Sequence, residues 1–126
     1  MRDEPDRLSF AGPSTMNPFR QAEAKAFLSQ AVLWTRRQPP GLLSAAEVWN
    51  LTLLCHCNLA RYQDLAEIRG ISENTIRRQM RSARLKLDAR TNLFAVAEAL
   101  RRDLIPRFSR WKPGERQAEI ILFPAA

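Results

Sequence analysis

The sequence predicts an all-α protein on three observations. Apolar residues recur at steps of three and four along successive segments, which is the spacing that brings side chains onto one face of an α-helix. Helix-capping and helix-breaking residues stand between these segments, so each helix has a defined beginning and end. The stretch 64–78 also has the pattern of two short helices joined by a tight turn.

The first 42 residues predict an arm followed by one amphipathic helix. Two prolines and a glycine lie among mixed charges in residues 1–16, which is typical of a flexible arm. Asn17 and Pro18 provide an N-cap and a first-turn proline, and the helix that they open runs to Arg37. We expect this helix to cover the core of its own domain, with contact to a second subunit as the alternative. The apolar face consists of Ala24, Phe27, Ala31 and Trp34.

The next element is predicted as a buried scaffold helix. Pro39-Pro40-Gly41 ends the first helix, and Ser44 with Glu47 forms a capping box, in which each side chain satisfies the other residue's backbone N–H. A further helix, capped by Asn58, is expected to extend to Arg69. Apolar residues of the scaffold helix follow the capping box to about position 57: Val48, Trp49, Leu51, Leu53, Leu54 and Cys55.

The centre of the chain encodes a turn between that further helix and a second one. Ala66 is small where two helix backbones must approach, and Gly70 stands where a left-handed residue ends the first helix. Ser72 is a natural N-cap, since its hydroxyl can accept from a backbone N–H two or three residues later. The helix over about 73–87 then places one apolar stripe on the body: Ile76, Met80, Ala83 and Leu87.

The opposite face of helix 73–87 is basic. The side chains that face outward or flank that face are Asn74, Arg77, Arg78, Arg81, Ser82 and Arg84. Arginine can bond both O6 and N7 of guanine, and a helix braced by a second helix is a common way to read the major groove. A merely solvated arginine-rich face is the alternative, but it requires no cap, glycine turn and brace helix in this order. The segment therefore predicts DNA recognition.

Composition agrees with an anionic partner. The chain of 126 residues has a net charge of +7 and a pI near 10.7, and its arginines are concentrated from Arg61 onward. This length allows one domain with extensions, and 45% apolar content supports an ordinary core. Because no long apolar run or signal-peptide pattern occurs, we expect a cytoplasmic, nucleoid-associated protein and no membrane contact.

Catalytic and metal-binding functions are not predicted. His56 is the one histidine of the sequence, and it lies between Cys55 and Cys57, whose side chains would point to different sides of a helix. Free thiols and a structural histidine are therefore expected, with no metal and no cofactor. Paired carboxylates, a nucleophile elbow and a phosphate-cradling glycine loop are also missing from the sequence, so it does not predict an enzyme.

The last part of the chain predicts one more helix and a tail. After a link over 88–92, another helical stripe is formed by Leu93, Val96, Ala97 and Leu100. Pro106 closes this unit. The apolar run 120–123 in the tail is strand-like or docked, and we expect it to pack on the body or on a partner chain, since exposure would favour aggregation.

These residues together resemble the LuxR-type (GerE-like) helix-turn-helix domain over about Leu43 to Ile105. The resemblance rests on Leu43-Ser44, on the turn from Gly70 to Ile76, on Lys86-Leu87, and on Arg90 with Ala95 to Ile105. It implies a four-helix unit whose third helix enters the major groove and whose fourth helix, in many members, makes the dimer contact.

The resemblance also implies roles for single residues. It suggests that Thr75 touches a phosphate and that Arg77, Arg78 and Arg81 reach base edges, while Arg69 stands where the family commonly has an apolar residue. The predicted DNA contacts are Gln63, Ser72, Asn74, Thr75, Arg77, Arg78, Arg81, Ser82, Arg84 and Lys86. The predicted dimer contacts are Leu93, Val96, Ala97 and Leu100.

We therefore expect an arm and helix over 1–42, a DNA-binding domain over 43–105 and a tail over 106–126. The function predicted is that of a sequence-specific transcriptional regulator that binds double-stranded DNA as a homodimer. One alternative is a protein-interaction module, an adaptor or anti-activator that binds another regulator or RNA polymerase. Another is an accessory, architectural factor that bends DNA. Region four of sigma factors is the closest rival resemblance, but the alanine-rich helix after residue 93 favours the LuxR type.

Overall fold

The computed structural model describes residues 16–57, 59 and 61–108. This part of the chain is all-helical and contains no β-strand, which confirms the predicted all-α class. The predictions for the arm before residue 16 and for the run 120–123 lie outside the described residues. The helices, in chain order, are α1 (Pro18–Arg37), α2 (Ala45–Cys57), α3 (Tyr62–Arg69), α4 (Glu73–Leu87) and α5 (Asn92–Arg101).

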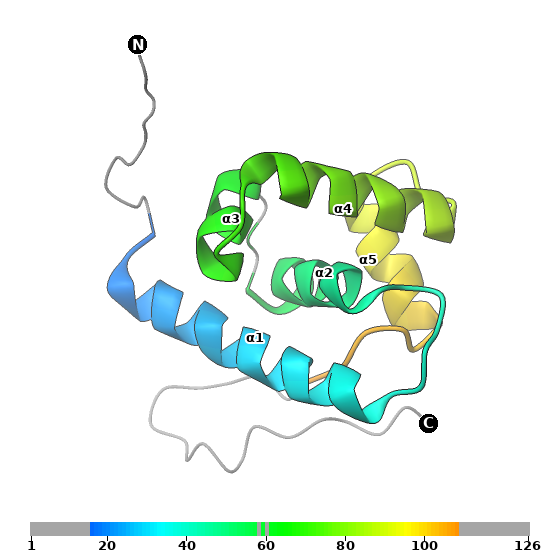
Figure 1. Ribbon diagram of the computed structural model, residues 1–126, viewed down its shortest axis with the longest axis horizontal. Helices are drawn as coiled ribbons and strands as arrows, with labels where there is room; N and C mark the ends of the chain where they lie inside the picture. Colours follow the sequence, from blue (N-terminus) through cyan, green and yellow to red (C-terminus); the bar gives the residue numbers. More distant parts are fainter. Residues whose placement is uncertain (1–15, 58, 60, 109–126) are drawn as a thin grey trace.

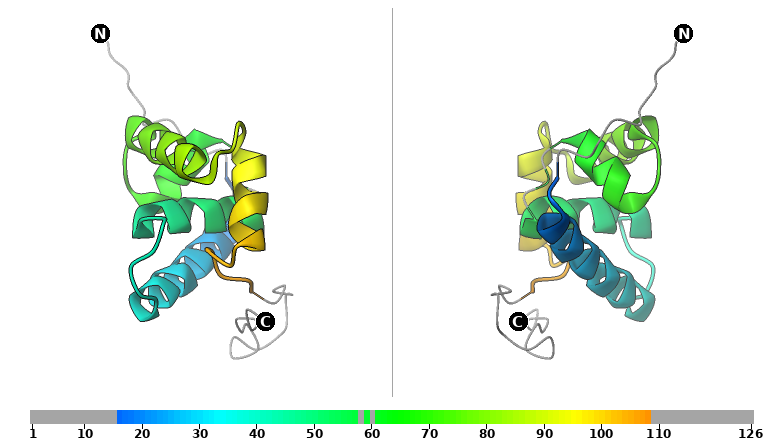
Figure 2. Two further views of the ribbon diagram at one scale, coloured as in Figure 1. Left: turned by 90° about the vertical axis from the view of Figure 1, so that its right-hand side faces the viewer. Right: turned by 90° about the vertical axis from the view of Figure 1, so that its left-hand side faces the viewer.

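Helix α2 is the centre of the fold. α1 lies along one side of it and α4 along the other, with α3 beside the beginning of α4 and α5 crossing one end (Figure 1). Figure 2 shows the same arrangement from two further sides, with α1 and α4 again separated by α2. α4 therefore keeps one long side away from the rest of the molecule.

One continuous hydrophobic core joins all of the helices. Phe27, Ala24 and Ala31 of α1 are buried in it, so α1 covers its own domain, as the sequence predicts. Leu51 of α2 and Met80 of α4 are fully buried, and each such side chain stabilises the fold by about 1.5–3 kcal/mol relative to exposure. The core thus extends across the boundary expected between residues 42 and 43.

The buried side of α2 is more polar than expected. Leu54 and Cys55, predicted for the apolar side, are only partly buried, whereas Asn50 and Thr52 are fully buried. The reason is that α2 has helices on two sides, so positions between the apolar ones are also enclosed. Thr52 satisfies its hydroxyl by donating to the Val48 carbonyl at 2.7 Å.

Most of the predicted helix caps are present. The Asn17 side chain accepts from the Arg20 N–H at 2.8 Å. In the capping box, the Ser44 N–H donates to Glu47 Oε1 at 2.8 Å, and the Glu47 N–H donates to Ser44 Oγ at 3.2 Å. These bonds confirm where α1 and α2 begin.

The start predicted for α3 is wrong. Its N-cap is Arg61 rather than Asn58, and Arg61 makes no side-chain capping bond. Leu59 is fully buried, so the chain must bring this side chain into the core before the helix can begin. The Arg61 carbonyl then accepts the first helical bonds, from the N–H groups of Asp64 and Leu65 at 3.1 Å.

An aromatic cluster connects α1 and α2 to the chain after α5. His56 stacks on Phe27 with ring centroids 5.6 Å apart, and Phe108 packs 5.1 Å from the His56 ring. His56 Nε2 donates to the Pro106 carbonyl at 3.0 Å, and burial lowers the pKa of this imidazole. Burial likewise raises the pKa of the Cys57 thiol, to about 12. His56 is therefore a structural member of this aromatic cluster, as expected.

Candidate nucleic-acid interface

The turn between α3 and α4 has the geometry that the sequence predicts. Gly70 has φ +68°, and its N–H donates to the Ala66 carbonyl at 2.8 Å, with the Ile71 N–H donating to the same oxygen at 3.1 Å. Ser72 Oγ accepts from the Thr75 N–H at 3.1 Å, which confirms the N-cap of α4. The turn fixes α3 as a brace across the beginning of α4.

The buried stripe of α4 determines which way its other side chains point. Ile76, Met80, Ala83 and Leu87 are all buried, as predicted. Side chains about 180° around the helix axis from this stripe therefore face away from the body. The exposed residues of α4 include Asn74, Arg77, Arg78, Arg81 and Leu85.

Arg78 and Arg81 are the two arginines of this outward face that have no internal partner. No group in the described part of the chain forms a hydrogen bond or ion pair with either guanidinium. Arg77 differs, because its Nη1 donates to Asn74 Oδ1 at 2.9 Å and its Cζ lies 5.7 Å from the Tyr62 ring centroid. Two arginines thus keep all of their donors available to a ligand, and a third is held beside them.

Three of the predicted DNA contacts are engaged inside the protein. Arg84 Nη1 donates to Tyr62 Oη at 3.3 Å and to Asn92 Oδ1 at 2.6 Å, so it ties α4 to α3 and α5. Lys86 Nζ pairs with Glu47 Oε1 at 2.8 Å, and Ser82 hydrogen-bonds the same carboxylate. These side chains support α4 rather than extend its outward face.

Glu47 is therefore the anchor of the last turns of α4. Burial alone would raise the pKa of Glu47, but hydrogen bonds from Lys86, Ser82 and the Ser44 N–H outweigh it and lower the pKa. The carboxylate stays ionised although its residue is buried. One capping-box residue thus also holds α4 on α2.

The other predicted contacts lie at the two helix N-termini. Thr75 is half-buried, and its Oγ1 lies 2.9 Å from Ser72 Oγ, so both hydroxyls serve the cap of α4. Gln63 is exposed in the first turn of α3 and accepts from Arg61 Nη2 at 2.6 Å. The protein's backbone N–H groups at helix N-termini attract phosphate, so both places are suited to contacts with the phosphates of a nucleic acid.

The stripe predicted for dimerisation is divided in the structure. Leu93 and Ala97 of α5 are exposed, Leu93 by 80%, and Phe94 beside them is 48% exposed. Val96 is buried in the core, and Leu100 is half-buried against it. The outer side of α5 is therefore formed by residues 93, 94 and 97, and Val96 belongs to the domain itself.

Two groups of side chains that lie behind the outward face of α4 are not among the residues predicted from the sequence. Tyr62 accepts from Arg84 and from Asn92 Nδ2, the latter at 3.1 Å, and it lies under Arg77. The second group is built from Asn50, Arg69 and Gln79, on three different helices. A signal existed for the second group, since Asn50 interrupts an otherwise apolar run and Arg69 replaces an expected apolar residue.

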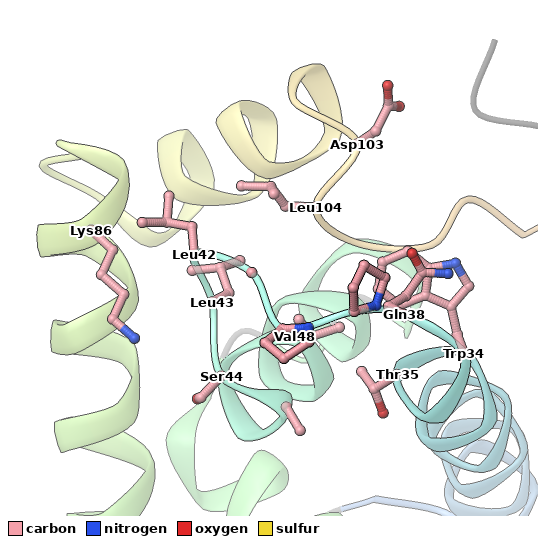
Figure 3. A pocket seen from close by; sticks show the side chains of 14 residues that line it. Trp34, Thr35, Gln38, Leu42, Leu43, Ser44, Val48, Lys86, Asp103 and Leu104 are labelled. Atoms are coloured by element: carbon pink, nitrogen blue, oxygen red, sulfur yellow. The ribbon is translucent and has the colours of Figure 1, made fainter.

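A separate open hollow of about 630 Å³ lies at the far end of α4 (Figure 3). The end of α1, the chain over 38–44 and residues 103–104 line it, and Lys86 is the predicted DNA contact that reaches it. Trp34, Leu42 and Leu104 make much of its wall apolar. Neither α3 nor the turn at Gly70 lines this hollow, and Arg78 and Arg81 do not reach it.

Within residues 16–57, 59 and 61–108, no cluster of three or more His, Cys, Asp or Glu side chains is arranged to hold a metal ion. In the same part of the chain, no helix has the length and apolar character needed to cross a membrane.

Comparison of the chain with models of known protein families, with characterised proteins and with solved structures gave no match.

Proposed function

We propose that this protein is a sequence-specific, double-stranded DNA-binding transcriptional regulator that inserts α4 into the major groove. The observation that carries the proposal is the state of Arg78 and Arg81. Both side chains project from the outward face of a braced helix, and neither has an internal partner among the described residues. A solvated surface helix does not need α3, a left-handed glycine and an N-cap to hold it in place.

The spacing of these side chains suits base recognition. Arg78 and Arg81 are three residues apart, which separates them by about 4.5 Å along the helix axis. Successive base pairs of B-DNA are about 3.4 Å apart, so the two guanidinium groups can reach neighbouring base pairs. Asn74 lies one further turn toward the N-terminus and can bond an adenine edge if it releases Arg77.

Backbone contacts would orient the helix. The N-terminus of α4, capped by Ser72, and that of α3, with Gln63, offer partial positive charge to phosphates on either side of the groove. The chain's net charge of +7 adds a general attraction that weakens as salt is raised. We further propose a homodimer on a two-fold symmetric site, with Leu93, Phe94 and Ala97 at the contact between copies.

A second candidate function is a protein-interaction module. Leu85 is 72% exposed on the outward face of α4, and Leu93 and Phe94 are exposed at the beginning of α5. Large exposed apolar side chains are typical of docking surfaces for other proteins. A protein-interaction module would have negligible affinity for duplex DNA at all salt concentrations. A DNA-binding regulator would instead show an affinity whose logarithm falls linearly with the logarithm of the salt concentration.

Selection of bound duplexes from a random DNA pool tests the proposal. We expect a recovered site with two inverted half-sites, and a dissociation constant that rises steeply with salt. The double variant Arg78→Ala/Arg81→Ala serves as the matched control, since it should fold normally yet recover no consensus. A pool that stays random with the natural chain, or a consensus unchanged in the double variant, would refute the assignment.

A further inference from the structure

A small polar cluster joins the three helices behind the outward face of α4. Arg69 of α3 donates through Nη1 to Asn50 Oδ1 of α2 and, at 3.2 Å, to Gln79 Oε1 of α4. Asn50 Nδ2 donates to the same Gln79 oxygen at 2.9 Å. We call Arg69, Asn50 and Gln79 the polar clamp. Each of its members bonds both of the others, so it closes a triangle among α2, α3 and α4.

The polar clamp lies in a poorly solvated place. Asn50 is fully buried, and the Arg69 guanidinium lies 5.1 Å from the Trp49 ring centroid, where burial lowers the pKa of the arginine. Its other acceptor is the Ala46 carbonyl at 3.5 Å. Among the described residues no carboxylate pairs with Arg69, so its charge is held by neutral oxygens and one aromatic face.

Stability alone does not account for such a cluster. Removing a charge and two amides from water is costly, and apolar side chains of similar size commonly stabilise a helix junction as well or better. A hydrogen-bonded junction differs from an apolar one in that its contacts depend on direction. The contacts of Ile76 and Met80 with the core are non-directional and tolerate small rotations of α4, whereas hydrogen bonds weaken steeply when misaligned.

We infer that the polar clamp is a positioning device that sets the rotation of α4 about its own axis and thereby determines base specificity. Gln79 lies between Arg78 and Arg81 in sequence, so fixing its side chain also fixes the directions of both arginines. A rotation of roughly 20° moves a side chain ~6 Å from the helix axis by ~2 Å, which is enough to break a hydrogen bond to a base. The specificity part of this inference rests on the proposed DNA-binding function.

Two substitutions and one control test the clamp. Gln79→Met removes the shared acceptor at nearly constant length, and Asn50→Leu removes the buried amide in case the first variant fails to fold. Gln79→Glu keeps an acceptor oxygen and serves as the conservative rescue. Thr52→Val is the matched control, since Thr52 is a fully buried polar residue of α2 that contributes only an intrahelical bond.

The first measurement does not involve DNA. Residual dipolar couplings of backbone N–H groups report the orientation of α4 relative to α2 in each variant. We expect Gln79→Met to change or average the couplings of α4, and we expect Gln79→Glu and Thr52→Val to leave them as in the natural chain. Unchanged α4 couplings in both Gln79→Met and Asn50→Leu would overturn the positioning role, whatever the protein binds.

The second measurement is the ratio of dissociation constants for the selected duplex and a scrambled duplex. Gln79→Met should lower this discrimination at least about fivefold, the smallest loss expected for one base contact, while the scrambled-duplex affinity and its salt dependence stay unchanged. Thr52→Val should keep the ratio. Altered couplings with full discrimination would overturn the specificity role. A natural chain without salt-dependent DNA affinity would instead refute the proposed function, and the couplings would still decide on the clamp.

Discussion

Replacing Arg78 with alanine separates one proposed base contact from the rest of the interface. The side chain is exposed on α4 and has no internal partner among the described residues. Its removal therefore breaks nothing within the fold, and alanine is a good helix former. The free energy of unfolding should change by less than about 0.5 kcal/mol.

The effect on DNA binding should be much larger and depend on sequence. Loss of a bidentate contact to guanine costs about 1–3 kcal/mol, which is roughly a 5-fold to 150-fold rise in the dissociation constant for the selected duplex. Scrambled DNA offers Arg78 only phosphate attraction, so its affinity should fall far less. The preference at one base position should relax, while the other positions keep theirs.

Fluorescence anisotropy with labelled duplexes, at several salt concentrations, measures both affinities. Arg37→Ala is the matched control, because Arg37 is an exposed arginine in the last turn of α1, on the other side of α2 from α4 (Figure 1). It removes the same charge from a face that the proposed function does not place against DNA. Equal losses on selected and scrambled duplexes for Arg78→Ala, or the same loss for Arg37→Ala, would refute the reasoning.

Other predictions concern the turn, the buried ionisable groups and the outer side of α5. Gly70→Ala should destabilise the fold by about 1–2 kcal/mol in denaturant unfolding, since φ is +68° although the added Cβ would meet no atom within 4 Å; an unchanged midpoint would contradict the left-handed turn. The pKa of the His56 ring, measured by NMR, should lie below 6.5. The free energy of unfolding should decrease as the pH drops from 6.5, because the imidazole of the unfolded chain binds a proton more readily than that of the folded protein. Above pH 4.5 the ionised Glu47 carboxylate stabilises the fold, and this stabilisation is lost as the pH falls through the lower pKa that Glu47 has in the folded protein. Glu47→Gln should therefore flatten the acid side of a plot of unfolding free energy against pH. Leu93→Asp should shift the protein to monomer in sedimentation without lowering its melting temperature, and a persistent dimer would exclude this surface.

Local signals in the sequence were sufficient to predict where most of the helices begin and end. Helix ends at Asn17, Ser44 and Ser72 follow from side chains that satisfy backbone groups within three residues, so neighbouring positions contain the necessary information. Gly70 marks the turn for the same reason. The start of α3 could not be predicted in this way, because it depends on the burial of Leu59 in the core, which no capping residue nearby indicates.

The candidate interface was predictable only in part for a similar reason. Helical periodicity placed Arg78 and Arg81 on the outward face correctly, because the opposite stripe is strongly apolar. Periodicity gave no indication that Arg84 bonds Tyr62 or that Lys86 pairs with a carboxylate 39 positions earlier. Contacts between helices of this kind depend on tertiary packing, which a single helix pattern does not specify.

The most direct test of the central claim maps duplex DNA onto the protein by NMR. Backbone amide shifts of the natural chain would be followed while the selected duplex is added. The proposed function predicts that the largest changes fall on α4 between Asn74 and Leu85 and on the first turn of α3, with α1 unaffected. Changes confined to α1 or to the outer side of α5, or no changes at low salt, would contradict it.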